Sequence, residues 1–291
     1  MQTHLLVRID AKMNTFSKGQ KLIAEFIEQH YDKAAFLTAS KLGELVGVSE
    51  STVVRFATEL GYNGYPELQK AMQEMIKDKL TSVQRIEVTA AKIADGNVLD
   101  TVLNQDIVKI RRTLEETSRE DFDKAVKAII NAENIYIFGV RSASFLASFL
   151  GYYFDLILGN VHVVTNASRS GMYEALLRIS EKDAIIGISF PRYSRTAESA
   201  MSFAKSRGAS TIAITDSVMS PLSANADSLL LARSDMASVV DSLVAPLSLI
   251  NALIVATVIN KKEEVKETFE MLETVWHEQD VYTSSHKKEK I

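Results

Sequence analysis

The chain has 291 residues, of which 46% are hydrophobic and 24% are charged, which is typical of a globular protein with about two domains. It has no cysteine, so disulfides and thiolate metal sites are excluded, and its five histidines are scattered. The net charge is −4, so any DNA contact must depend on a local group of cations. Because the sequence has neither an apolar run of about 18 residues nor a signal core, we expect a cytoplasmic protein that does not enter membranes.

Residues 1–16 are expected to form a short helix or an arm. The next segment, residues 17–31, has an amphipathic stripe of Leu22, Ile23, Phe26 and Ile27 behind a Ser17 cap. It should pack on the two helices that follow.

Residues 39–61 predict two short helices joined by a tight turn. Leu42, Leu45 and Val46 give the first helix one apolar face. Gly43 lies in the middle of that helix, where glycine costs about 1 kcal/mol relative to alanine, so we expect a second helix to cross close by. Gly47 can adopt the positive φ that ends a helix.

Ser49 is a predicted N-cap for the second helix, which turns Val53, Phe56 and Leu60 inward. The opposite face presents Glu50, Ser51, Thr52, Arg55 and Glu59 to solvent. Ser51, Thr52 and Arg55 lie where a recognition helix contacts bases and phosphates, and Arg55 can bind guanine in two-pronged fashion. The alternatives are an ordinary helical hairpin with an Arg55–Glu59 ion pair, or a helix pair that contacts protein.

After Gly61, the pair Asn63-Gly64 predicts a turn, and Pro66 suits the first position of another helix. Tyr65 is a candidate phosphate contact, with core packing as the alternative. Local positive charge is expected from Lys18, Lys21, Lys41, Arg55 and Lys70.

The segments SKGQKLIAEFI and TASKLGELVGVSESTVVRFATELGYNGYPELQ resemble the N-terminal domain of the RpiR family of bacterial transcriptional regulators. The resemblance implies binding of a double-stranded DNA operator, with Ser51, Thr52 and Arg55 on the operator-facing surface. The full set of candidate DNA-binding residues is Ser49, Ser51, Thr52, Arg55, Lys41 and Tyr65.

Residues 78–131 are interpreted as a helical connector. A helix over about 98–117 carries Leu99, Val102, Leu103, Ile107, Ile110 and Leu114 near one stripe, and another covers about 120–131. These helices could lie between domains or across a dimer interface, and the sequence alone does not decide.

The second half contains five short apolar runs that alternate with helical segments, at residues 134–139, 161–165, 184–189, 211–215 and 228–232. Such runs predict a five-stranded parallel sheet covered by helices on both faces, which is a three-layer α/β domain. Ligands of open parallel sheets bind at the carboxyl ends of the strands. The residues directly after the runs are therefore the candidates for a site.

Two loops after these runs carry hydroxyls and arginines and lead into helices. The first has Arg141, Ser142 and Ser144; the loop after the third run has Ser189, Arg192, Ser194 and Thr196. Helix N-termini attract anions, and guanidinium groups bind phosphate or carboxylate with two prongs. In the alternative reading the serines are plain helix caps and the arginines are surface charge.

Residues 130–258 resemble a sugar isomerase (SIS) domain through FGVRSAS, ISFPRYSRTAES, AKSRGASTIAITDS and SPLSANADSLLL. The resemblance implies binding of a phosphorylated sugar, with the phosphate at Ser142, Ser189, Ser194 and Thr196. The chain departs from the family pattern because Arg141 replaces a glycine, Ala143 replaces a serine, and the 190–193 segment makes the third loop longer and bulkier. We therefore expect a small anionic effector, with a phosphosugar as the leading candidate and charge supplied by Arg141 and Arg192.

A sugar-phosphate isomerase with an accessory helical domain is the alternative function. It would need a base such as Glu174, Glu198 or His162. His162 lies inside a strand run, where a core histidine is expected, and both glutamates are expected on solvated faces. Asp216 and Ser217 either line the pocket or form a plain turn.

Residues 238–260 predict a buried helix that Pro246 kinks or divides, followed by a charged helix at 261–277 and a disordered tail. The predicted divisions are a helix-turn-helix domain at 1–77, a connector at 78–131, an SIS-like domain at 132–260 and a C-terminal helix and tail at 261–291. The sequence as a whole predicts an effector-responsive transcription factor without enzyme activity, cofactor or metal, and at least a dimer.

Overall fold

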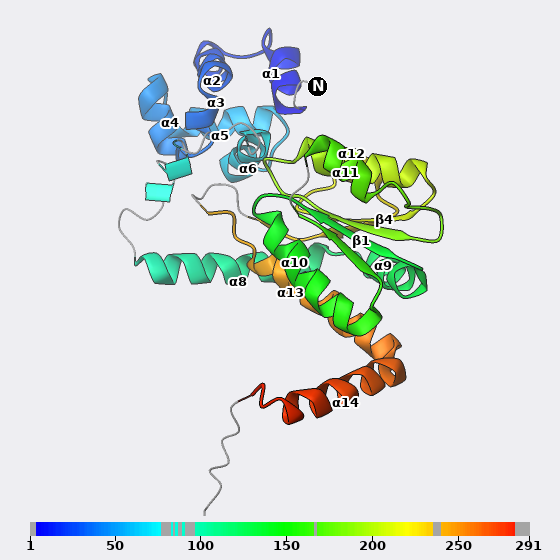
Figure 1. Ribbon diagram of the computed structural model, residues 1–291. Coiled ribbons are helices and arrows are strands. Elements are labelled where there is room, and N and C mark those ends of the chain that lie inside the picture. Colours follow the sequence, from blue (N-terminus) through cyan, green and yellow to red (C-terminus); the bar gives the residue numbers. More distant parts are fainter. Residues whose placement is uncertain are drawn as a thin grey trace, which may run out of the picture. The chain divides into compact units, whose positions relative to one another are not determined.

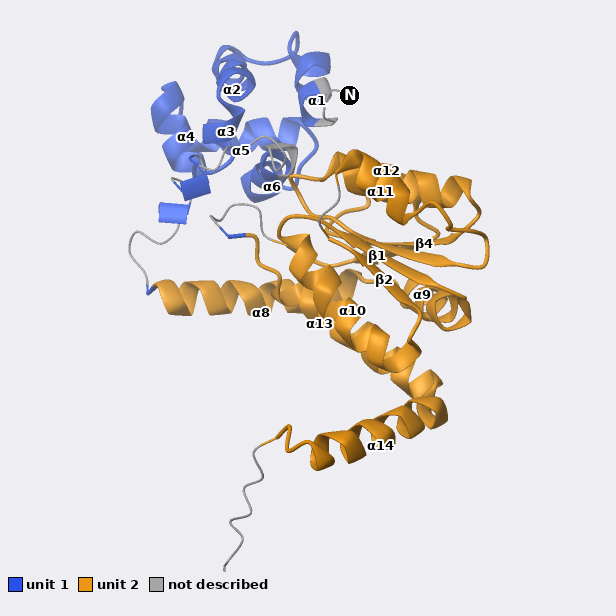
Figure 2. Ribbon diagram, in the orientation of Figure 1, with its two compact units in different colours: residues 1–97, 236–240 blue, residues 98–235, 241–291 orange. Residues whose placement is uncertain are grey.

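The computed structural model describes residues 4–76, 83, 85–86, 89–90, 97–165, 168–234 and 240–282. The chain forms two compact units (Figure 2). The first consists of residues 1–97 and 236–240, and the second of residues 98–235 and 241–291. The predicted tail after Tyr282, and most of residues 78–96, lie outside the described residues.

The described part of the first unit is helical. Its elements are α1 (His4–Lys12), α2 (Lys18–Gln29), α3 (Tyr31–Ala34), α4 (Ala39–Val46), α5 (Glu50–Glu59) and α6 (Tyr65–Ile76). Their core includes Ile23, Leu42, Val53 and Phe56, as the apolar spacing predicts. The prediction was wrong for Leu22 and Leu45, which are exposed because each lies at the edge of its helix's apolar stripe.

The turn between α4 and α5 explains the glycine in the middle of α4. A Cβ atom on Gly43 would lie 2.7 Å from the carbonyl oxygen of Val48. The crowding therefore comes mainly from the turn backbone, and less from a crossing helix as the sequence suggested. Gly47 ends α4 with φ 78°, and the Ser49 hydroxyl accepts a hydrogen bond from the Thr52 N–H at the start of α5.

The second unit contains the predicted five-stranded parallel sheet, in the order β2-β1-β3-β4-β5. Its strands are β1 (Ile135–Gly139), β2 (Val161–Val164), β3 (Ala184–Ile188), β4 (Ser210–Thr215) and β5 (Ser228–Leu231). β1 and β3 are fully buried, which confirms what continuous apolar runs indicate. The expectation of a core histidine was wrong, because β2 is an edge strand. His162 is exposed there and stacks on Tyr136, with ring centroids 4.8 Å apart.

Helices cover both faces of this sheet (Figure 1). One face packs against α11 (Arg169–Ala175) and α12 (Arg195–Ser206), and the other against α9 (Arg119–Asn131), α10 (Ala143–Leu158) and α13 (Val244–Asn260). The helix α8 (Val98–Glu116) packs beside α13. In the chain, α13 is followed by α14 (Lys262–Glu278). Helices α8 and α9, predicted as part of a connector, belong to the second compact unit. The predicted divisions at 77, 131 and 260 stay predictions.

Pro246 does not kink or divide α13. The helix begins at Val244, so the proline lies in its first turn, where a missing N–H breaks no intrahelical hydrogen bond. Among the described residues, no single helix is long and apolar enough to span a membrane. Only α13 and α14 together reach the required length, and they are bent by 100° at their junction.

Asp183 ties the start of β3 to its surroundings. Its carboxylate accepts hydrogen bonds from the Asn134 amide at 2.9 Å and from the N–H and hydroxyl of Ser180 at 2.8 and 2.9 Å. Burial favours a higher pKa for Asp183, but these hydrogen bonds outweigh it and lower the pKa. The ionised form therefore stabilises the fold. This stability is fully present above the unfolded pKa, near 4, and is lost as pH falls toward the folded value.

We predict that Asp183→Asn lowers the free energy of unfolding at neutral pH and reduces its loss between pH 6 and 3. Urea unfolding at several pH values measures both effects. Glu181→Gln, two residues away and exposed, is the control and should retain the wild-type pH dependence. An unchanged acid profile in Asp183→Asn would contradict this role.

We also predict that Gly43→Ala destabilises the α4–α5 pair by about 1–3 kcal/mol, because the backbone oxygen that its Cβ meets cannot rotate away. Hydrogen exchange of the α4 and α5 amides measures this locally. Gly47→Asn is the control, since Gly47 has open space around it and asparagine tolerates its positive φ. Equal protection in Gly43→Ala and wild type would show that the turn adjusts.

Candidate functional site

Two loops leave the sheet side by side at its carboxyl edge. β1 and β3 pair in parallel, and Gly139 is the register partner of Ile188. Gly139 also lets α10 begin close to the strand, because a Cβ there would lie 2.6 Å from the carbonyl oxygen of Ala143. The two predicted loops therefore start next to each other at the same level of the sheet.

The first loop holds Arg141 in a left-handed conformation, with φ 58°. Glycine favours this region, and other residues with such a φ are uncommon. The Ser144 hydroxyl donates to the Arg141 carbonyl at 2.6 Å, and the Ser142 hydroxyl donates to Asp241 at 3.4 Å. Both predicted serines thus have bonds inside the protein, while the Arg141 side chain is exposed.

The loop after β3 is folded around its own hydroxyls. Ser189, which is buried, accepts a hydrogen bond from the Ser194 N–H at 3.1 Å, and Ser194 in turn caps α12 by accepting from the Ala197 N–H at 3.3 Å. Each serine uses its oxygen as an acceptor in these bonds. Their O–H groups are therefore the hydroxyl donors that a ligand could recruit.

Tyr193 fixes the bulky part of the same loop. Its hydroxyl donates to Asp216, a fully buried carboxylate directly after β4, at 2.8 Å. Asp216 thus has a structural role that the alternatives of pocket lining or plain turn did not include. Within this loop Phe190 and Pro191 are buried, and Arg192 is exposed.

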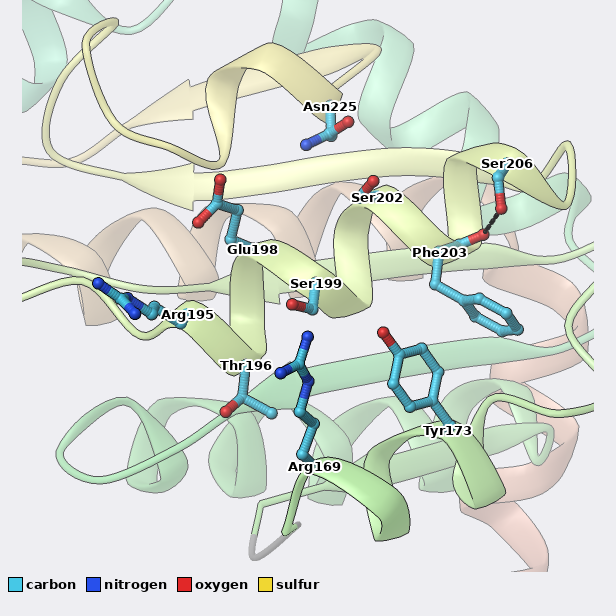
Figure 3. A pocket seen from close by; sticks show the side chains of 10 residues that line it. All are labelled: Arg169, Tyr173, Arg195, Thr196, Glu198, Ser199, Ser202, Phe203, Ser206 and Asn225. Atoms are coloured by element: carbon cyan, nitrogen blue, oxygen red, sulfur yellow. Dashed lines mark hydrogen bonds between the residues drawn. The ribbon is translucent and has the colours of Figure 1, made fainter. Parts of the chain in front are cut away.

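Thr196 lies in a different place from the other predicted residues. It lines a groove of about 600 Å³ between α11 and α12, together with Arg169, Tyr173, Arg195 and Ser199. In Figure 3, Arg169 extends from α11 toward Ser199 on α12. Sequence reasoning missed Arg169, although its position directly after the Ser168 cap, at the start of the helix that follows β2, was a usable signal.

The described part of the edge carries uncompensated positive charge. Arg141, Arg192, Arg169 and Arg195 form no ion pair with any described residue. Guanidinium groups without a carboxylate partner favour an anion from solution. The described residues contain no group of three His, Cys, Asp or Glu side chains placed to hold a metal ion.

The candidate bases are all in open positions. Glu174 on α11 and Glu198 on α12 are exposed, as predicted, and so is His162. Among the described residues that line the groove between α11 and α12, Glu198 is the one carboxylate.

On the first unit, α5 presents an exposed face with Glu50, Ser51, Arg55 and Glu59. Arg55 forms no ion pair with Glu59 or with any other residue in the described ranges, so the helical-hairpin pair is not observed. Arg55 adjoins two surface hollows. Ser51 lines the one of about 620 Å³, and Thr52 lines the one of about 560 Å³. Thr52 is half-buried, contrary to expectation, because its methyl group packs beside Gly19 of α2. Its hydroxyl shares a hydrogen bond with Ser49 at 2.8 Å.

The remaining DNA-binding candidates differ in outcome. Ser49 is exposed but serves as the α5 cap, and Lys41 is exposed and pairs with Glu44 at 2.8 Å. Tyr65 was assigned wrongly. It is 4% exposed, its hydroxyl donates to the Leu37 carbonyl at 2.7 Å, and burial raises its pKa to about 12. A hydroxyl committed to the core cannot contact a phosphate.

Family models match both units of the chain. Residues 3–79 match a model described as the helix-turn-helix domain of the rpiR family, and residues 128–256 match the SIS domain model. Similar proteins include HTH-type transcriptional regulators, themselves uncharacterized, of Haemophilus influenzae and Caldanaerobacter subterraneus. The Haemophilus protein is 25% identical, and the match covers 77% of this chain and 78% of that protein. The Caldanaerobacter protein is 24% identical, and the match covers 90% of this chain and 93% of that protein.

Solved structures are similar as well. The sugar isomerase domain of an RpiR transcription factor from Sphaerobacter thermophilus is 26% identical, with a TM-score of 0.58, over 61% of this chain and 98% of its own. The NanR protein of Vibrio vulnificus, complexed with ManNAc-6P, is 22% identical, with a TM-score of 0.56, over 94% of this chain and 99% of its own. The second comparison shows that the two-domain fold is shared.

Proposed function

Because the chain belongs to the RpiR family of helix-turn-helix transcriptional regulators with an SIS domain, we propose that it binds an operator and that an anionic metabolite controls this binding. The observation that carries the proposal is the presence of two sets of uncommitted arginines in one chain. Arg55 lies on an exposed helix of the first unit, and Arg141 and Arg192 lie at the sheet edge of the second.

In this proposal α5 enters the major groove. Arg55 reads a base edge, and Ser51 and Thr52 contact bases or phosphates near the helix N-terminus, where the helix dipole favours negative charge. Lys41 and Ser49 flank this surface and contribute to phosphate binding. Lys41 must exchange its exposed ion pair with Glu44 for a phosphate, at small cost because exposed pairs are worth about 0–1 kcal/mol.

The effector is proposed to bind at the edge formed by the two loops. Arg141 and Arg192 supply charge, and Ser189 and Ser194 supply O–H donors once the loop admits a ligand. Ser142 and Ser144 would exchange internal acceptors for the ligand, and Thr196 approaches it from the groove side. NanR, a protein of the same two-domain fold, is complexed with ManNAc-6P, which supports a phosphorylated sugar as the ligand class.

The left-handed conformation of Arg141 adds weight to this placement. A residue other than glycine costs about 1–2 kcal/mol in this conformation, and we propose that the Arg141 side chain offsets this cost by binding the ligand. The family pattern has glycine at this position, which makes Arg141 a candidate determinant of effector choice.

We propose a binding protein and not an isomerase. Proton transfer within a sugar needs a base held close to the bound substrate, whereas Glu174, Glu198 and His162 are all exposed. Steady-state turnover of a hexose phosphate by the purified protein would overturn this part of the proposal.

The active species is proposed to be at least a dimer in the cytoplasm, where operator DNA is accessible. Paired half-sites about one helical turn apart match a protein with two-fold symmetry. The effector would act by binding one arrangement of the subunits more tightly than another.

We predict that Arg55→Ala weakens operator binding by about 1–3 kcal/mol and leaves effector affinity unchanged. Fluorescence anisotropy with the protein's own upstream DNA, at two salt concentrations, measures this. Lys33→Ala, which removes an exposed cation outside the candidate surface, is the control. If the wild type shows no salt-dependent duplex binding, the assignment of this helix pair to DNA is wrong.

We predict that Arg141→Gly weakens binding of the effector by about 10- to 100-fold without loss of fold stability, since glycine accepts the positive φ. Calorimetry with a panel of sugar phosphates, including ManNAc-6P, and with inorganic phosphate measures affinity, and thermal unfolding measures stability. Arg192→Ala should weaken binding similarly, whereas Arg207→Ala, at the opposite end of α12, should not. Unchanged affinity in both loop variants would remove the site from this edge.

A further inference from the structure

The helix α8 exposes an unusual amount of apolar side chain. Eight of its 19 residues are large, apolar and between 38% and 64% exposed: Val98, Leu99, Val102, Leu103, Ile107, Val108, Ile110 and Leu114. A soluble helix normally turns one apolar stripe into its own core. Contiguous apolar surface of this kind is typical of an interface.

Polar contacts, not this apolar surface, attach α8 to its own unit. Asp106 accepts from the Ser242 hydroxyl at 2.7 Å, and the Thr113 hydroxyl accepts from the Arg233 N–H at 2.8 Å. Glu116 pairs with Arg233 as well. In Figure 1 the N-terminal half of α8 extends past α13. Val98 and Val102 are 57% and 44% exposed.

The spacing of the exposed residues suits a two-fold contact. Leu99, Leu103, Ile107, Ile110 and Leu114 follow one another at intervals of four, four, three and four residues, which is the spacing of a helix-pairing seam. If two copies of α8 cross antiparallel near Ile107, Leu99 faces Leu114 and Leu103 faces Ile110. Every two-fold interface needs such a self-complementary surface.

The charges on α8 support the same orientation. Asp100 and Arg111 lie on the same flank of the stripe, and the antiparallel register brings Arg111 of one copy level with Val102 of the other, within one turn of its Asp100. Opposite charges therefore approach beside the seam, while Thr113 and Lys109 are largely buried against the helix's own unit.

We infer that the exposed α8 stripe (Leu99, Leu103, Ile107, Ile110 and Leu114) is a subunit interface, in which α8 of one chain packs antiparallel on α8 of a second copy. A homodimer is the occupant that fits, because interfaces between identical chains are the more apolar class. The inference rests on the proposed function only for the expectation of a two-fold assembly.

The first test is the mass of the full chain in solution, measured by light scattering at micromolar concentration. Leu103→Glu should shift the protein from dimer to monomer, because it places two carboxylates in the apolar interface. Asn104→Glu adds the same charge on the next residue, which is exposed and off the stripe, and should remain dimeric. A Leu103→Glu protein with the mass of the wild type, or a monomeric wild type, would overturn the inference.

The second test uses the absence of native cysteine. Leu99→Cys and Leu114→Cys proteins, treated with a short bis-maleimide, should form covalent dimers when mixed, and far fewer when treated separately. Efficient self-linking of Leu99→Cys would instead indicate parallel pairing and would overturn the antiparallel assignment. The absence of any intermolecular product would overturn the inferred pairing of the two α8 helices.

The outcomes separate this inference from the proposed function. If Leu103→Glu keeps the wild-type mass and the wild type binds duplex DNA, the inferred interface is wrong and the proposed regulatory function stands. If the wild type binds no duplex DNA but Leu103→Glu becomes monomeric, the inferred interface stands and the proposed regulatory function is wrong.

Discussion

The parallel pairing of β1 with β3 is the constraint on which the second unit depends. It aligns Gly139 with Ile188, so two loops with arginines and serines leave the sheet at one level. Both strands are buried on both faces, and a slip of register would expose apolar side chains and unpair backbone groups. The site is therefore placed by two fully buried strands of the unit.

In the first unit, contacts at its two ends fix the position of α5. The narrow turn at Gly43 and Gly47 fixes where α5 begins, and Ser49 completes that end. At the other end, Arg8 donates to the Leu60 carbonyl at 3.3 Å, and Lys12 donates to the Glu59 carbonyl. Cations at the C-terminus of a helix offset its negative pole. These two cations are thus used internally, while Arg55 in the middle of α5 forms no ion pair with any described residue.

The sequence was sufficient for features that depend on local pattern. Five apolar runs predicted five strands, and capping serines predicted the starts of α2 and α5, because these signals lie within a few residues. It was insufficient where the outcome depends on distant segments. Tyr65 is buried in a core that includes residues about 28 positions earlier, as its hydrogen bond to the Leu37 carbonyl shows. His162 is exposed on β2, the edge strand of the sheet in the described part of the chain.

In the candidate site, too, local features were predictable from the sequence and long-range contacts were not. The residue types and their place after two strands were predictable, since parallel strands share an edge. The partners of these residues were not, because Asp216 and Asp241 reach Tyr193 and Ser142 across 23 and 99 residues of sequence. Nor could spacing show that Thr196 lines a groove with Arg169, since that depends on how α11 packs against α12.

These distant contacts suggest how the site and the α8 stripe communicate. Ser142 in the first loop bonds Asp241, and the next residue, Ser242, bonds Asp106 on α8. An anion that draws Ser142 away would remove one hydrogen bond from Asp241, and a shift of Asp241 would be passed along the backbone to Ser242. Asp106 holds α8 at the level of Ile107, where the two copies are inferred to cross. Effector binding and helix pairing would then bias the same short segment, which is what coupling between two sites requires.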